Sequence, residues 1–163
     1  MTQRQRFASM STSVLLVASL WLLGCATQLA PAFDERIVDG LTRANADAMT
    51  LFAAFSAGAP TSRFAEYRDR YDQLIGAVDA LEMQIAARPT PELPAGLSAP
   101  LAQRAVDASG PPVEPVQGMS RTIRMMRDTH AASGLTAAEV DGLRRQWTIY
   151  ADQALTYEAY LNR

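Results

Sequence analysis

The sequence contains no lysine, one histidine and one cysteine, and each scarcity removes a class of chemistry. All 15 basic residues are arginine, so Schiff-base catalysis and a lysine general base are excluded. His130, the only histidine, provides no pair of imidazoles for a haem or a di-iron centre. Cys25, the only cysteine, has no partner for a disulfide within the chain.

The motifs of several enzyme classes are also missing. The chain has no Cys-x-x-Cys-His for haem attachment, no Glu-x-x-His for a di-iron site and no Gly-x-Ser-x-Gly nucleophile turn. Asp128 is two residues from His130, which places the two side chains on different faces of a helix. We therefore predict that the protein is not an enzyme, and we assign no catalytic residue, no cofactor and no metal site.

The first 24 residues have the order of an export signal. Arg4 and Arg6 stand in a segment without acids, and the apolar run 14–23 follows. A membrane-spanning helix needs about 20 apolar residues, and this run has about half that number. The order predicts a secretory signal that is cleaved, with an uncleaved anchor or a buried N-terminal helix as the alternatives.

The run ends in Leu22-Leu23-Gly24-Cys25, which resembles the lipobox of bacterial lipoproteins. The resemblance implies that residues 1–24 are removed, that the thiol of Cys25 is diacylated, and that the new N-terminus is acylated as well. Several acyl chains hold a protein stably on a membrane, whereas one chain does not. Cys25 is therefore the lipidation site that we predict.

The residue after Cys25 bears on location. In the Gram-negative lipoproteins that this sequence resembles, an Asp at that position retains the protein in the inner membrane, and here the residue is Ala26. We expect the outer membrane, with the protein facing the periplasm. In a bacterium with one membrane the same anchor would point outward.

Without residues 1–24 the chain has 13 arginines and 17 acids, so its net charge is about minus four. This balance offers no basic patch for nucleic acid, and no small-molecule substrate is evident. The remaining 139 residues suit one domain. We expect a lipidated tether at 25–33 and a folded domain at 34–163.

Apolar residues recur at steps of three and four along four segments, which predicts four amphipathic helices. A glycine ends the first segment and the third, and Thr136 with Glu139 forms a capping box before the fourth. None of the apolar stripes contains an acid. The predicted helices cover residues 34–57, 61–88, 114–132 and 136–161.

The segment 89–115 is rich in proline: six of the nine prolines lie between residues 89 and 112. A short helix at 98–108 is compatible with this segment, whose path is left open. Two short links and one long link favour an all-α fold, a four-helix bundle with this long connection between its second and third helices. The chain has no 34-residue repeat, so a helical solenoid ranks lower.

His130 lies on the stripe of the third helix, one turn after Met126, with Met119 further back. Thioether and imidazole ligands suit copper, so a periplasmic copper-handling bundle is one alternative. The other interpretation is structural: methionines fill gaps in cores, and a histidine suits the last turn of a helix. In an up-down-up-down bundle, His130 would meet Phe55, Phe64 and the first loop.

Aromatic and arginine residues suggest a surface for a partner. Tyr71, Trp147 and Tyr150 are expected in the core, whereas Tyr160 is expected to be exposed near Arg163. The arginine pairs Arg121/Arg124 and Arg144/Arg145 would extend such a surface.

These observations predict a lipid-anchored envelope protein that acts by protein–protein contact or structurally. One specific version is a pilotin-like escort of an outer-membrane pore subunit, which would bind a helical peptide in a groove. The end of the bundle around His130 would face away from the lipid, and we expect a partner there.

Overall fold

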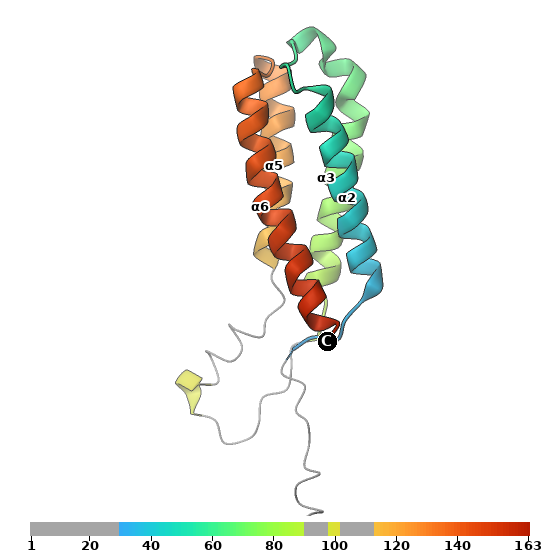
Figure 1. Ribbon diagram of the computed structural model, residues 1–163, viewed down its shortest axis with the longest axis vertical. Coiled ribbons are helices and arrows are strands. Elements are labelled where there is room, and N and C mark those ends of the chain that lie inside the picture. The colour runs from blue at the N-terminus through green and yellow to red at the C-terminus, as the bar shows by residue number, and fades with distance from the viewer. Residues whose placement is uncertain (1–29, 90–97, 102–112) are drawn as a thin grey trace, which may run out of the picture.

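The computed structural model describes residues 30–89, 98–101 and 113–163, and these residues are predominantly helical, with no β-strand among them (Figure 1). Four long helices lie side by side, and a single 3₁₀ turn, η1 (Thr61–Arg63), precedes the second of them. The long helices are α2 (Glu35–Ala54), α3 (Phe64–Ala86), α5 (Val113–Ala132) and α6 (Ala137–Leu161). The sequence prediction of an all-helical chain is confirmed for these residues.

Successive helices run antiparallel, so the molecule has two distinct ends (Figure 1). The two short links, 55–63 and 133–136, meet at one end, which we call the loop end. The chain enters α2 and leaves α6 at the other end, which we call the open end. Helix α3 packs most closely against α5, and α2 packs less closely against α3 on one side and α6 on the other.

Helices α2 and α6 begin at a residue whose side chain caps them, whereas α3 has no side-chain cap. Asp34 accepts a hydrogen bond from the backbone N of Arg36 at 3.0 Å, which satisfies an amide in the first turn of α2. The capping box of α6 is confirmed: Thr136 N donates to the carboxylate of Glu139 at 2.8 Å, and Glu139 N donates to Thr136 Oγ1 at 3.2 Å.

The two short loops are joined by their backbones. Ala59 N donates to Leu135 O at 2.8 Å, and Leu135 N donates to Ala59 O at 2.7 Å. Each loop contributes a glycine with a left-handed backbone, Gly58 at φ +89° and Gly134 at φ +80°. A Cβ on Gly58 would lie 2.6 Å from Leu135 O, and one on Gly134 would lie 2.7 Å from Ala59 O. Both positions therefore require glycine, for the backbone angle and for the close approach.

The core follows the predicted stripes closely in three helices. Helix α2 buries Ile37, Leu41, Ala44, Ala48 and Leu51, helix α3 buries Tyr71, Leu74, Val78, Leu81 and Ile85, and helix α5 buries Val116, Met119, Ile123, Met126 and His130. The buried apolar residues form one cluster, to which the loop end adds Phe55, Ala59 and Leu135. Burial of this cluster is the main source of stability for these helices.

Regular spacing along the last helix predicts that Tyr150, Ala154 and Tyr157 face the core, and for the two tyrosines this prediction is wrong. Tyr150 and Tyr157 are only partly buried, and the buried positions in this half of α6 are Ala154, as predicted, together with Ala151 and Glu158. The aromatic ring of Tyr150 lies instead over Gly118 of α5, where an added Cβ would be 2.6 Å from ring carbons. Glycine at 118 lets this large ring lie on the side of the core rather than inside it.

Several predictions fall on residues outside the described ranges. These are the cleaved signal 1–24, the lipobox with Cys25, and most of the proline-rich connection, including residues 102–108 of the short helix. Within that helix, residues 99–101 are described and are helical. Of the helices in the described part of the chain, none combines the length and the apolar character that crossing a membrane requires.

Candidate functional site

His130 lies fully buried at the loop end, where both of its ring nitrogens have a partner. Nε2 is 3.1 Å from the carbonyl oxygen of Pro60. Because a carbonyl only accepts, Nε2 carries the proton and donates it. Nδ1 therefore accepts from the hydroxyl of Tyr71, which is 3.2 Å away. The histidine thus connects α5 to α3 and to the first loop.

Three aromatic rings surround this histidine edge-on. The ring of His130 has its centroid 5.0 Å from that of Phe55, 5.6 Å from that of Phe64 and 6.0 Å from that of Tyr71. The prediction that His130 meets Phe55, Phe64 and the first loop is confirmed. Burial raises the pKa of Tyr71 well above its ordinary value, so its hydroxyl keeps the proton that it donates.

This environment bears on the copper hypothesis. A metal at His130 would have to displace either the Tyr71 hydroxyl or the Pro60 carbonyl from a ring nitrogen. Met119 and Met126 are fully buried members of the apolar core. Within residues 30–89, 98–101 and 113–163, no three His, Cys, Asp or Glu side chains gather in a way that would hold a metal ion. In this structure His130 instead links α5 to α3 and to the first loop through these two contacts.

The other candidate aromatic residues divide between core and surface. Tyr71 and Trp147 are fully buried, and the indole Nε1 of Trp147 donates to Asn45 Oδ1 at 3.0 Å. Tyr160 is 65% exposed, and the guanidinium of Arg163 lies 5.9 Å from its ring centroid. The predictions for these residues are confirmed.

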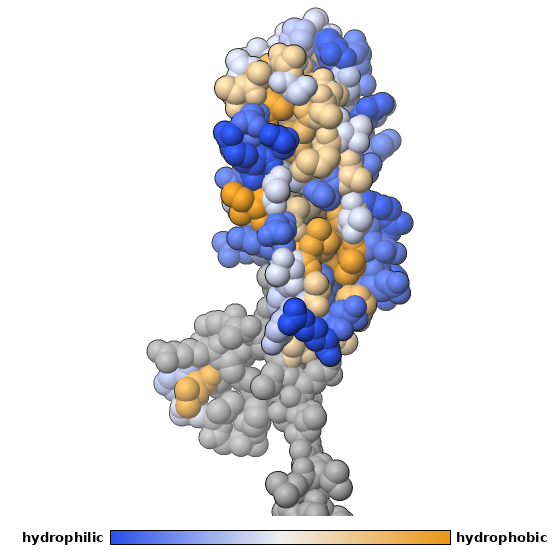
Figure 2. Space-filling view, in the orientation of Figure 1, coloured by the Kyte–Doolittle hydropathy of each residue, from blue (hydrophilic) through white to orange (hydrophobic). Residues whose placement is uncertain are grey.

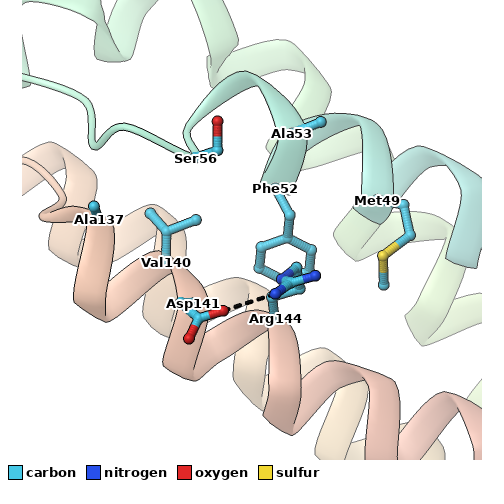
Figure 3. A pocket seen from close by; sticks show the side chains of 8 residues that line it. All are labelled: Met49, Phe52, Ala53, Ser56, Ala137, Val140, Asp141 and Arg144. Carbon is cyan, nitrogen blue, oxygen red and sulfur yellow. Dashed lines mark hydrogen bonds and ion pairs between the residues drawn. The ribbon is translucent and has the colours of Figure 1, made fainter.

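A groove runs between α2 and α6 on the loop-end half of the molecule (Figure 3). It has a volume of about 520 Å³. The lining residues are Met49, Phe52, Ala53 and Ser56 of α2 and Ala137, Val140, Asp141 and Arg144 of α6. Met49 and Phe52 point from α2 toward α6, and Val140 faces them from the other wall (Figure 3).

The floor of this groove is apolar and firmly supported. Phe52 and Val140 are buried members of the core, and Met49 is partly buried against it. The ring of Phe52 meets the ring of Trp147 edge-on, with centroids 6.4 Å apart. Figure 2 shows an apolar strip along the seam between α2 and α6, with hydrophilic residues on both sides of it. The groove is thus an open part of that seam, and its floor belongs to the apolar core.

One wall of the groove is charged. Asp141 accepts a hydrogen bond from Arg144 at 2.7 Å and also pairs with Arg145. The hydrogen bond from Arg144 is the main reason that the pKa of Asp141 lies below its ordinary value. Two guanidinium groups thus share the carboxylate of Asp141, and of these two arginines Arg144 lines the groove. Arg144 and Arg145 are exposed, as the sequence suggests.

The second arginine pair behaves differently. Arg121 is exposed, but the side chain of Arg124 is partly buried and contacts residues at the interface between α3 and α5. Its guanidinium pairs with Asp79 and donates from Nε to Ser120 Oγ at 3.1 Å, while Ser120 donates to Asp79 at 2.8 Å. Arg124 is therefore part of the polar packing between two helices rather than a free surface residue.

A buried ion pair at the open end was missed from the sequence. Glu158 is 2% exposed and Arg88 is 7% exposed, measured on their side chains. The interpretation that no stripe contains an acid is therefore wrong. A signal was present: Glu158 follows Ala151 by seven residues and Ala154 by four, which continues a core-facing register.

Comparison of the chain with protein-family models, with curated proteins and with solved structures finds no match.

Proposed function

We propose that this protein is a lipid-anchored component of a bacterial cell envelope, and that it acts by binding another protein. Its folded part is a four-helix bundle held near the membrane by lipid on Cys25. The lipobox Leu22-Leu23-Gly24-Cys25 supports the anchor, and the short stretch 26–33 before α2 supports a position close to the membrane. Ala26 after the cysteine favours the outer membrane.

The groove between α2 and α6 is the observation that supports binding. It combines an apolar floor from Met49, Phe52 and Val140 with a polar wall, as binding surfaces for peptides commonly do. Its lining covers residues 49–56 of α2 and 137–144 of α6. Eight residues of helix extend about 12 Å, which matches two turns of a partner helix.

The segments of α2 and α6 that line the groove lie toward the loop end, away from the end where the chain enters α2 (Figure 1). With the tether at the open end, the groove faces away from the lipid and is accessible to other envelope proteins. A pilotin-like escort is a specific form of this proposal, since such a protein needs a groove for a helical segment of its client.

The anchor is tested by Cys25→Ala. We expect that the variant is not labelled by a radioactive fatty acid and that it keeps residues 1–24. Its distribution between the membrane and soluble fractions should differ from that of the unmodified chain. Cys25→Ser, which keeps a small polar side chain without a thiol, is expected to behave in the same way. Processing and fractionation like those of the unmodified chain would refute the anchor.

The groove is tested by Ala53→Arg, with Ala54→Arg as a matched control. Both alanines are exposed and lie at the end of α2, but only Ala53 lines the groove. Proteins captured with the full lipidated chain from its native envelope should be lost with Ala53→Arg and kept with Ala54→Arg. Equal capture by the two variants would exclude the groove as the binding surface.

A further inference from the structure

A second groove follows the opposite side of α2, between α2 and α3. One hollow of about 740 Å³ is lined from α2 by residues that include Gly40, Arg43 and Asp47, and from α3 by residues that include Ala77 and Leu81. A second hollow of about 270 Å³ continues toward the loop end. The two hollows share Asp47, and together they follow α2 from Asp34 to Leu51.

The shape of this groove suits a helix that lies along it. Residues 34–51 of α2 extend about 26 Å, or roughly five helical turns, in a straight line. Small residues form much of the lining, among them Gly40, Ala44, Ala77 and Ala87. At Gly40 the backbone of α2 comes close to α3, because a Cβ at this position would lie 2.6 Å from Leu81 Cδ2. A shallow floor of small side chains lets a third helix approach the seam between α2 and α3 closely.

The charges on the groove favour an acidic partner. Arg43 projects from the α2 wall and Arg70 from the α3 wall, and both are exposed. Within the part of the chain that the structure describes, neither arginine has an ion-pair partner, whereas Arg36 in the same groove is paired with Asp34. Among the residues that line the two hollows, Asp47 is the one acid between the two arginines. The lining in the middle of the groove therefore has two positive charges and one negative charge, in a molecule that is negative overall.

We infer that the groove between α2 and α3 binds an amphipathic helix that presents small apolar side chains to the floor and carboxylates to Arg43 and Arg70. Arginine is the residue best suited to such a contact, because its planar group binds a carboxylate through two hydrogen bonds. This inference rests on the proposal that the protein works by contact. It adds a second surface and specifies the chemistry of the partner. Helix α2 would then lie between two bound segments.

Site-specific crosslinking tests this surface in the full lipidated chain. A photo-reactive amino acid replaces Ala77, which is exposed and lines the groove. The control position is Met83 on the same helix, which is 73% exposed and lies outside the lining of both hollows. After irradiation of the native envelope, mass spectrometry identifies the crosslinked segment. We expect an acidic helical segment of another protein from position 77 and not from position 83.

Charge reversal tests the contact with the two arginines. The double variant Arg43→Glu/Arg70→Glu should reduce the crosslink from position 77 by about fivefold or more. Arg121→Glu, an exposed arginine on α5, should leave it unchanged. Lysines in place of the acids of the crosslinked segment should restore the crosslink to the double variant.

The outcomes separate this inference from the proposed function. A crosslink to a second copy of the chain, to phospholipid or to a segment without acids would overturn the inference, as would the absence of any crosslink. If the crosslinking result overturns the inference but Ala53→Arg still abolishes capture, the groove between α2 and α6 remains supported as the binding surface. A crosslink from position 77 that survives charge reversal would also overturn the inference.

Discussion

Arg88 and Glu158 face each other inside the open end through two hydrogen bonds of 2.8 Å, one from each terminal nitrogen of the guanidinium to one carboxylate oxygen. The pair joins the residues just beyond α3 to the last turns of α6. Nearby, the hydroxyl of Tyr157 and Nε of Arg88 are buried without a partner among the described residues. Burial is the main reason that the pKa of Tyr157 is raised.

Removing one member of this ion pair should lower the free energy of unfolding strongly. Glu158→Gln leaves the guanidinium of Arg88 buried without a countercharge, and we expect a loss of about 3–5 kcal/mol in the free energy of unfolding. The double variant Arg88→Met/Glu158→Leu removes both charges and should recover most of the loss. Urea unfolding of the three proteins measures the difference. A double variant less stable than Glu158→Gln would contradict this account.

The loop end depends on its two glycines. Gly58→Ala and Gly134→Ala each place a Cβ against a carbonyl oxygen of the other loop, on a left-handed backbone. Each should lower the free energy of unfolding by more than about 1 kcal/mol. Gly76→Ala is the matched control, because it is an exposed helical position with nothing within 4 Å of the added Cβ. It should stabilise by about 0.5–1 kcal/mol. Equal effects at all three positions would refute the argument.

The hydroxyl of Tyr71 should contribute measurably to the free energy of unfolding. Tyr71→Phe keeps the ring packed against Phe55 but leaves Nδ1 of His130 without a donor in a buried site. We expect a loss of about 1–3 kcal/mol in the free energy of unfolding. Tyr160→Phe removes a hydroxyl from an exposed ring and should change stability very little. Thermal unfolding compares the two, and similar losses would count against the hydrogen bond.

The start of α6 should weaken in acid. The backbone hydrogen bond from Thr136 is the main cause of the lowered pKa of Glu139, whose ordinary value is 4.5. A carboxyl whose pKa is lower in the folded state stabilises that state above pH 4.5, and the contribution disappears as the pH falls through the lower folded value. Glu139→Gln should therefore flatten the decrease in stability on acidification. Melting temperatures measured from pH 6 to pH 3 test this, with Glu35→Gln as the control.

Much of the fold could be predicted because its signals are local. Regular spacing placed the core residues of α2, α3 and α5, and the cap of α6 was correct to the residue. In α6, two neighbouring registers were possible for the core-facing positions, one with Tyr150 and Tyr157 and one with Ala151 and Glu158. Hydrophobicity alone favoured the register with the tyrosines. Only the three-dimensional packing reveals that Gly118 provides space for Tyr150 and that Arg88 makes Glu158 a core residue.

The candidate grooves could not be predicted from the sequence, because they too depend on three-dimensional packing. A groove depends on how far two helices stand apart, and helix spacing depends on the pairing of residues distant in the sequence. Ala53 and Ala77 look like ordinary exposed alanines in the sequence, yet each lines a hollow. His130 is the opposite case, since its place beside Phe55 and Phe64 followed from helix order alone.

The backbone link between Ala59 and Leu135 also determines how the molecule would carry a mechanical load. The chain enters α2 at the open end, and the link joins the far end of that helix to the second helix pair. Under the proposed function, a pull between the membrane and a partner bound beside α2 would act along the axis of that helix. Because two backbone hydrogen bonds join the loops, the loop end would pass part of such a load from α2 to α5 and α6.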